Sequence, residues 1–347
     1  MTQDIPLISV VLPVYNVQDY IEECIASILS QSVQDFEVVV IDDCSTDRTV
    51  EIIESFDDQR IQITRKEKNG GLIESLNVGF QLAKGKYIAR VDGDDYNHPL
   101  RFEKQLNILI NNPKVNACGC WMESFGSTKF IIKHRKEHKE IQSRLLISNS
   151  MSLCSAMLFK EAFKNFQFNI EKIHVEDYDF WAQAAWSCEF YNIQEVLYFY
   201  RFHEEQVSTK YKKLQEKGDI DIKLELFHKL LYDVLKYPDS LLTKILNSNI
   251  DCDFMEFKSF FKWCEVIMIQ NFKLNIFDKT EFEKVISEIR WKIIFKLYFK
   301  NTRLGVNSRL RFSVFRLLNS LEKWTVFKLK TKERIKLIKA ALKRINN

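Results

Sequence analysis

The stretch KGKYIARVDGDDYNHP, Lys84 to Pro99, joins an apolar run to a cluster of acids. Tyr87 to Val91 has the composition of a buried strand, and three carboxylates follow it within four residues, at Asp92, Asp94 and Asp95. Like charges packed this closely repel one another. The sequence therefore predicts a positive partner beside this loop.

Strand and helix patterns alternate around this stretch. Ile8–Val14 and Phe36–Asp42 are continuous β-rich runs, typical of strands buried on both faces, and a helical pattern follows each. A helix around Ile73–Ala83 precedes the strand at Lys86–Val91, and another helix opens at Pro99. Strand–helix–strand repetition predicts an α/β domain with a mostly parallel sheet flanked by helices.

Polar clusters follow three of these predicted strands. They are YN at Tyr15 and Asn16, DDCS at residues 42–45 and DGDD at residues 92–95. In sheets of this kind ligands bind beyond the carboxyl ends of the strands. We therefore expect the loops that carry chemistry to lie along one edge of the sheet.

Asp92 and Asp94 stand two residues apart after a strand, with Gly93 between them to let the backbone turn. Two such carboxylates can converge on a hard divalent cation, Mg²⁺ or Mn²⁺, which takes oxygen ligands from carboxylates, phosphates and water. The alternative is a solvated acidic turn that caps the next helix.

Six strings occur in a fixed order along the first part of the chain: PVYN, VVIDDCSTDRT, NGGLIESLNVGF, KGKYIARVDGDD, VEDYDFW and YRFHEEQVS. In this order and spacing they resemble the family 2 glycosyltransferases with the GT-A fold, over roughly residues 7–208. The resemblance implies a GT-A nucleotide-diphospho-sugar transferase domain at residues 1–210. It also implies metal-dependent, inverting transfer from a UDP-sugar, with Mn²⁺ or Mg²⁺ as cofactor.

The resemblance assigns nucleotide contacts to the first two loops. Pro13, Tyr15 and Asn16 match the loop that contacts the nucleotide, with Tyr15 as the stacking partner of the base; Pro13 could equally be a strand terminator. Asp43 matches the carboxylate that accepts a hydrogen bond from the base N–H, which favours uracil. The family commonly has Gly where Cys44 stands.

The resemblance also assigns contacts to the later loops. Gly71 and Gly93 match positions near the nucleotide, although Gly71 also suits an ordinary strand-to-helix turn. Asp92 would reach the ribose or a metal-bound water. Asp94 is expected to be the direct metal ligand, with Asp95 as a supporting acid.

The catalytic base is expected in KIHVEDYDFWAQAAW. Glu176, Asp177 and Asp179 crowd the start of an amphipathic helix, where acids are favourable simply through the helix dipole. The family has its base at this ED pair, where a carboxylate takes the proton of the acceptor hydroxyl as its oxygen attacks the anomeric carbon. We choose Asp177, with Glu176 as orienting neighbour and second candidate.

Two residues of YRFHEEQVS complete the predicted site. His203 matches a histidine that supports the metal or diphosphate, although a lone histidine is more often a structural hydrogen-bonding group. Arg201 could pair with diphosphate oxygens or simply anchor a loop.

The chain joins an acidic body to a basic tail. Residues 1–204 hold 21 Lys and Arg against 30 Asp and Glu, while residues 205–347 hold 30 against 17. From Arg290 onward 17 basic residues face only Glu322 and Glu333. The eight cysteines are scattered and fit no zinc spacing, which favours buried, reduced thiols.

Residues 211–347 are predicted to form a helical region, basic and amphipathic from about residue 290. The expected helices are Ile220–Lys236, Phe254–Asn271, Thr280–Phe299, Ser308–Trp324 and Thr331–Ile345. In the last helix Ile335, Ile338, Leu342 and Ile345 fall on one side, with Lys332, Lys336, Lys339 and Lys343 on another. This pattern suits an anionic membrane surface. The alternatives are that these helices pack on the body or form a homodimer contact. Nucleic acid is a further alternative, which we do not expect because no recognised nucleic-acid-binding module is present in the sequence.

The resemblance implies a UDP-sugar-dependent hexosyltransferase acting on a lipid-linked or surface glycan, such as lipopolysaccharide, capsule or exopolysaccharide. No secretory signal and no membrane-spanning run is recognisable, so we expect a cytoplasmic protein, peripheral at the inner face of the plasma membrane. One alternative is a sugar-1-phosphate nucleotidyltransferase. Such enzymes carry a Gly-rich, basic signature after the first strand, and the stretch PVYNVQDY of this chain has none. The other is a non-catalytic binding or scaffold protein on the same fold.

Overall fold

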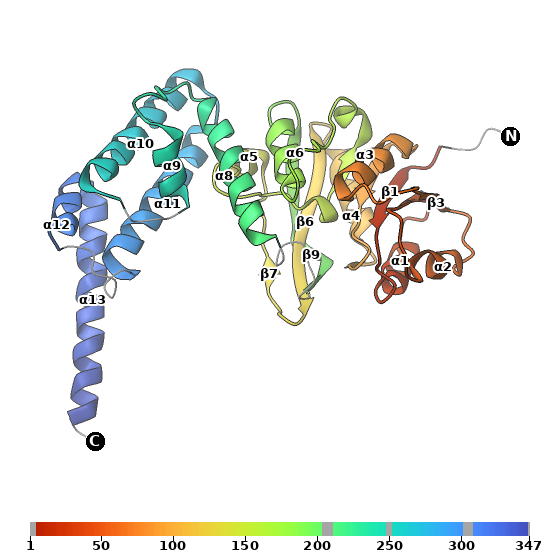
Figure 1. Cartoon of the computed structure of the whole chain (residues 1–347), viewed down its shortest axis with the longest axis horizontal. Helices are drawn as coiled ribbons and strands as arrows, with labels where there is room; N and C mark the ends of the chain where they lie inside the picture. Colours follow the sequence, from red (N-terminus) through yellow and green to blue (C-terminus); the bar gives the residue numbers. More distant parts are fainter. Residues whose placement is uncertain (1–4, 203–210, 248–251, 301–307, 346–347) are drawn as a thin grey trace. The chain divides into compact units, whose positions relative to one another are not determined.

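The computed structural model describes residues 5–202, 211–247, 252–300 and 308–345 (Figure 1). It divides into two compact units, the first extending to Leu226 and the second beginning at Phe227. The predicted α/β architecture with a helical C-terminal region is confirmed.

The first unit contains, within the described residues, one nine-stranded sheet. Its strands are β1 (Ile8–Val14), β2 (Phe36–Asp42), β3 (Ile61–Arg65), β4 (Tyr87–Arg90), β5 (Tyr96–Asn97), β6 (Val115–Gly126), β7 (Ile131–Ile132), β8 (Met157–Phe159) and β9 (Glu189–Phe202). Its helices are α1 (Ile21–Leu29), α2 (Thr49–Glu54), α3 (Leu72–Leu82), α4 (Arg101–Asn111), α5 (His138–Arg144) and α6 (Glu176–Ala184). A further helix, α8 (Lys212–His228), leads to the boundary of the two units.

The sheet is parallel in one half and mixed in the other. Its strand order is β3-β2-β1-β4-β8-β6-β9-β5, with β7 beside β6. The first four strands are parallel, as predicted, but β8 is antiparallel to both β4 and β6, and β5 is antiparallel to β9. The predicted mostly parallel sheet is therefore confirmed, with antiparallel strands confined to the second half, where the longest pairing, β6 with β9, is again parallel. Strand β6 was not predicted, because its sequence, VNACGCWMESFG, has no continuous run of β-branched apolar residues.

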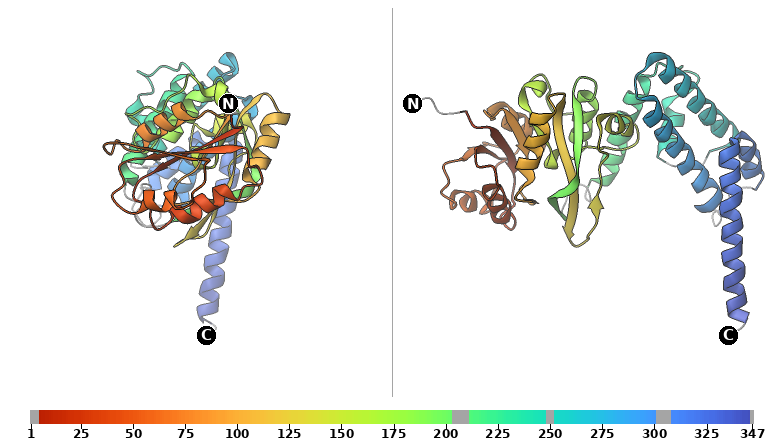
Figure 2. Two further views of the ribbon diagram at one scale, coloured as in Figure 1. Left: turned by 90° about the vertical axis from the view of Figure 1, so that its right-hand side faces the viewer. Right: turned by 180° about the vertical axis from the view of Figure 1, so that it is seen from behind.

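Helices cover both faces of this sheet (Figure 2). Every residue of β1 and β2 is buried, as expected for strands between two helical layers. Helix α1 buries Ile21, Cys24, Ile25 and Ile28 against the same core. The loops that follow the carboxyl ends of the central strands are therefore attached to a well-packed core.

The second unit is helical in its described residues. Its helices are α9 (Asp239–Leu246), α10 (Phe254–Leu274), α11 (Lys279–Phe295), α12 (Ser308–Leu317) and α13 (Ser320–Ile345). The predicted helix Ser308–Trp324 is wrong, because α12 ends at Leu317 and a new helix begins at Ser320. Asn319 and Glu322 exchange side-chain-to-backbone hydrogen bonds of 2.9 Å in both directions, which caps the new helix. The predicted start at Thr331 is likewise wrong, since it lies inside α13.

Among the described residues, none of the helices combines the length and the apolar composition that a membrane crossing requires.

Candidate functional site

The loops that follow β1, β2 and β4 lie side by side at one edge of the sheet. Val14 at the end of β1 is in register with Asp42 of β2, and Asp43 N–H donates to the Val14 carbonyl at 2.9 Å. On the other side, Val91 N–H donates to the Val11 carbonyl at 3.2 Å. The polar residues after all three strands are thereby gathered in one region.

Asn16 holds the first two loops together. Its backbone lies in the left-handed region with φ 50°, its N–H donates to Ser45 Oγ at 3.0 Å, and its side-chain oxygen accepts from Thr46 N–H at 2.8 Å. Asn16 therefore shapes the loop from within. Tyr15 beside it leaves 48% of its surface exposed, which makes its ring available for stacking. Pro13 is buried in β1, opposite Ile41.

Asp43 is buried and receives three hydrogen bonds. Lys66 Nζ donates to Oδ1 at 2.7 Å, Gly70 N–H donates to the same oxygen at 2.9 Å, and Gly71 N–H donates to Oδ2 at 2.8 Å. Burial by itself would raise the pKa of Asp43, but the Lys66 ammonium and the two N–H groups hold it below its usual value. Asp43 is thus a carboxylate, and its Oδ2 accepts one bond where two can fit.

Gly71 and Cys44 both have left-handed backbones beside Asp43. Gly71 has φ 85° and precedes the first residue of α3, an arrangement that glycine adopts at no steric cost. Cys44 has φ 67°, where a side chain is unfavourable, so glycine would suit this position.

Two arginines supply the positive charge that the acidic loop was predicted to need. Arg90 is buried at the end of β4 and forms an ion pair with Asp92, whose N–H donates to Tyr198 Oη at 3.0 Å. The second is Arg201 of β9, which contacts the loop at Asp94 and Asp95. The two guanidinium groups therefore provide part of the positive charge that the sequence predicts beside this loop.

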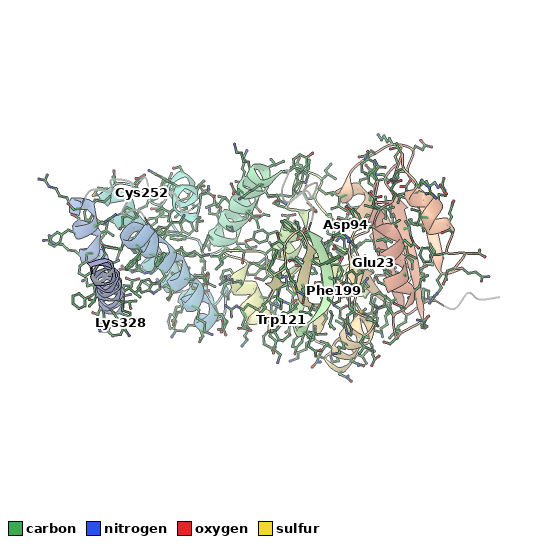
Figure 3. The ribbon with its side chains drawn as sticks, turned by 90° about the horizontal axis from the view of Figure 1, so that it is seen from below. Glu23, Asp94, Trp121, Phe199, Cys252 and Lys328 are labelled. Atoms are coloured by element: carbon green, nitrogen blue, oxygen red, sulfur yellow. The ribbon has the colours of Figure 1, made fainter. Side chains whose placement is uncertain are left out.

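Arg201 connects this loop to α1. Its N–H donates to Asp95 Oδ1 at 2.7 Å, its Nε donates to the Asp94 carbonyl at 2.8 Å, and its guanidinium pairs with Glu23. The guanidinium also lies 4.8 Å from the Tyr20 ring centroid and 4.5 Å from that of Phe125. These contacts favour the anchoring alternative for Arg201 over diphosphate pairing. Figure 3 labels Asp94 in the loop and Glu23 on α1.

Gly93 is required by close packing. It has no left-handed backbone angle, but an added Cβ would come within 3.1 Å of Val14 Cγ1 and 3.2 Å of Val17 Cγ2. The loop therefore packs closely against β1 and the start of the following loop.

The acidic corner has a donor set that fits a divalent cation. Ligand atoms of Asp92, Asp95 and Cys154 all lie within 4.8 Å of one another. Asp95 is buried, and its Oδ2 has no hydrogen-bond partner among the described residues. Burial and the charges of Asp94 and Asp92 raise the pKa of Asp95. Asp94 is half-buried in the same loop but is outside this group of three.

Glu176 and Asp177 begin α6 close to the acidic corner. Asn149 Nδ2 donates to Asp177 Oδ2 at 2.8 Å. The side-chain oxygen Oδ1 of Asn149 accepts from Met151 N–H at 3.1 Å, which orients the side-chain amide. Asp179, the third acid of the cluster, is buried and bonds to Gln183 of the same helix.

Burial raises the pKa of both acids. It raises that of Asp177 to about 6, and together with the Asp177 charge it raises that of Glu176 to about 7. The charges of Arg90 and Asp92 act on both groups, so the two acidic sites share one electrostatic environment. A carboxylate with a pKa near 6 is suited to accept a proton near neutral pH.

Sequence reasoning missed several residues of this region, among them Lys66, Arg90, Asn149, Cys154 and Tyr198. Arg90 did leave a signal, because a charge inside the apolar run YIARV must find a partner when the strand is buried. Lys66 and Asn149 left none, since each meets its partner only through the fold. The predicted metal residue His203 lies outside the described residues.

Residues 9–167 match the family described as "Glycosyl transferase family 2". A protein of Haemophilus influenzae described as "Uncharacterized glycosyltransferase" is 33% identical over 240 residues, covering 64% of this chain and 74% of that protein. "Uncharacterized glycosyltransferase MJ1057" of Methanocaldococcus jannaschii is 33% identical over 207 residues, covering 57% and 71%.

A solved structure shares the fold at lower sequence identity. It is described as "Crystal structure of S. aureus TarS 1-349 in complex with UDP-GlcNAc". The TM-score is 0.53 at 18% identity, covering 90% of this chain and 79% of that one.

Proposed function

Because this chain belongs to the family 2 glycosyltransferases, with a GT-A fold, we propose that it moves a sugar from a UDP-sugar to a hydroxyl group of a glycan acceptor. One observation carries the proposal. The carboxylate Asp43, the acidic corner at Asp92–Asp95 and the raised-pKa acid Asp177 converge at one edge of the sheet. We place the chemistry within residues 1–210.

The first two loops are proposed to bind the nucleotide. Tyr15 is exposed enough to stack on the base, and Asp43 Oδ2 retains room for the base N–H, which favours uracil. Gly71 lets the backbone come close to the ribose, while Asn16 and Pro13 keep the loop in shape. The structure of TarS with UDP-GlcNAc, a protein of the same fold, supports a uridine nucleotide as the first donor to test.

The acidic corner is proposed to hold Mn²⁺ or Mg²⁺. Asp94 and Asp92 are the proposed ligands, Asp95 is the supporting acid, and His203 remains a candidate. Such an ion supplies positive charge beside the diphosphate as negative charge develops on the leaving group. Arg201 and Arg90 fix the loop from two sides, so its carboxylates are preorganised before any ion arrives.

Asp177 is the proposed catalytic base, with Glu176 as its neighbour. The acceptor hydroxyl loses its proton to an Asp177 carboxylate oxygen while its own oxygen bonds to the anomeric carbon. The bond from that carbon to the diphosphate oxygen breaks, and UDP leaves with the electron pair. Attack from the face opposite the diphosphate inverts the anomeric centre. Asn149 holds the carboxylate in place for this step.

The nucleotidyltransferase alternative has weaker support. That chemistry needs free N–H groups and cations in the first loop to bind triphosphate. Here the N–H groups of Asn16, Val17 and Gln18 already donate to Ser45, Thr49 and Asp47.

Thermal unfolding in the presence of UDP-, GDP- and ADP-linked sugars tests the proposal. UDP-linked donors should stabilise the protein only when Mn²⁺ is present, because they bind the folded state. Asp94→Ala should remove the effect, whereas Asp177→Ala should retain it and lose UDP release in the presence of acceptor. Stabilisation by every nucleotide sugar alike, without metal, would refute the proposal. A protein that binds UDP-sugars but never transfers would be the scaffold alternative.

The proposed acceptor is a lipid-linked or surface glycan: lipopolysaccharide, capsule or exopolysaccharide. Such an acceptor would place the enzyme at the inner face of the plasma membrane, and the chain has a surface suited to that location.

A further inference from the structure

The first turns of α13 are fixed to the second unit by a buried ion pair. Arg290 of α11 donates to both oxygens of Glu322, at 2.7 and 2.8 Å, and Glu322 is 3% exposed. Val326, one turn further along, is also buried. This contact determines which side of α13 faces the unit.

The other side of α13 carries large apolar residues in water. Leu321, Trp324 and Phe327 recur every three residues, so they lie on one side of the helix. They are 67%, 57% and 71% exposed, respectively. We call these three residues the α13 stripe. Singly scattered apolar residues are normal on a protein surface, whereas a contiguous exposed group of this kind is a candidate binding surface.

Cations lie directly over the exposed aromatic rings. Lys328 Nζ is 4.4 Å from the ring centroid of Trp324, and Figure 3 labels Lys328 on α13. Helix α12 repeats the arrangement, with Arg316 5.0 Å from the ring of Phe312, which is 63% exposed. An apolar body with a cation at its edge is the arrangement that suits the boundary between lipid headgroups and acyl chains.

Charge complementarity selects the partner. From Arg290 onward the sequence holds 17 basic residues against two acidic ones. A second copy of this chain would bring two basic surfaces together, which is unfavourable. Single-stranded nucleic acid stacks successive bases on a series of aromatic rings, and Trp324 and Phe327 would supply only the start of such a series. Here the apolar positions in phase with the α13 stripe continue in the sequence as the aliphatic residues Ile335, Ile338 and Leu342.

We propose that the α13 stripe, with Lys328, docks on an anionic membrane surface, its apolar side chains entering the headgroup region. The inference deepens the proposed function by naming the surface on which the enzyme works. It does not depend on the transfer chemistry, so either can fail without the other.

Vesicle co-sedimentation of the full chain tests this proposal. We expect binding to phosphatidylcholine vesicles containing about one third phosphatidylglycerol, and little binding to phosphatidylcholine alone. The double variant Trp324→Ser/Phe327→Ser should bind the anionic vesicles at least about tenfold more weakly. Leu235→Ser/Phe272→Ser is the matched control, since it removes two exposed apolar residues of the same unit outside the stripe. It should bind as the unchanged protein does.

Three results would overturn the proposal. The first is that the unchanged protein does not bind anionic vesicles. The second is that the stripe variant binds them as tightly as the unchanged protein does. The third is that the stripe is required for a dimer or for an oligonucleotide complex while no vesicles are bound. Far-UV circular dichroism of the same samples verifies that each variant keeps the helices of the second unit. Metal-dependent stabilisation by UDP, measured separately, tests the proposed function apart from this proposal.

Discussion

Replacing Asp43 by Asn should destabilise the first unit by about 2–3 kcal/mol at neutral pH. The change keeps the shape of the side chain but leaves the Lys66 ammonium buried without its closest partner. Removing one member of a buried ion pair typically costs about 3–5 kcal/mol. Lys66 keeps a second acid, Glu74, at 3.4 Å, and Glu74 is about half exposed, so we place the loss below that range.

The effect should depend on pH with a definite sign. The pKa of Asp43 is lowered in the folded protein, so its contribution is fully present above the pKa of the unfolded chain. It disappears as the pH falls through the folded-state pKa. The difference between the unchanged protein and Asp43→Asn should therefore shrink in acid.

Hydrogen exchange measured by mass spectrometry through a urea titration is the suitable assay. Peptides from β1 and β2 report the unfolding of the first unit separately from that of the second, which a single spectroscopic signal does not. Lys66→Met is the control, and the double variant should lose less stability than the two single variants added together. A loss below about 0.5 kcal/mol for Asp43→Asn, or a loss unchanged at low pH, would refute the reasoning.

Four further predictions concern the proposed site. If Asp177 is the base, kcat/KM should fall tenfold per pH unit below about pH 6, where burial places its pKa, and a flat profile would exclude it. Asn149→Ala should lower kcat at least about tenfold with donor KM unchanged, and move this limb to higher pH because the carboxylate loses a donor. Arg201→Lys should weaken metal-dependent UDP binding in calorimetry despite its charge, since it lacks the guanidinium fork. Cys44→Gly should stabilise the fold by about 0.5–1 kcal/mol and Cys44→Val destabilise it, judged by urea midpoints.

The parallel half of the sheet was predictable because its strands are buried on both faces. Ile8–Val14 and Phe36–Asp42 are continuous apolar runs, and the structure has strands with these same limits. Strands such as β8, three residues long, and β6, with its cysteines and glycines, owe their conformation to their neighbours. No local pattern marks them.

The site was partly predictable for a related reason. Acids at strand ends are visible in a sequence, but the residues that hold them are not. Arg201 was singled out from the sequence, but its contacts with the loop and with Glu23 depend on residues far away in the chain. The order of the motifs therefore predicts which residues lie at the site. The hydrogen bonds and ion pairs among those residues are shown only by the folded structure.

The most direct test of the account is the location of the metal. Crystals grown with UDP and Mn²⁺ would give an anomalous difference map in which the ion appears as an isolated peak. We expect one peak bonded to an Asp94 carboxylate oxygen and to the diphosphate. An empty acidic corner, or a peak held by Asp95 and Cys154 away from the diphosphate, would contradict it.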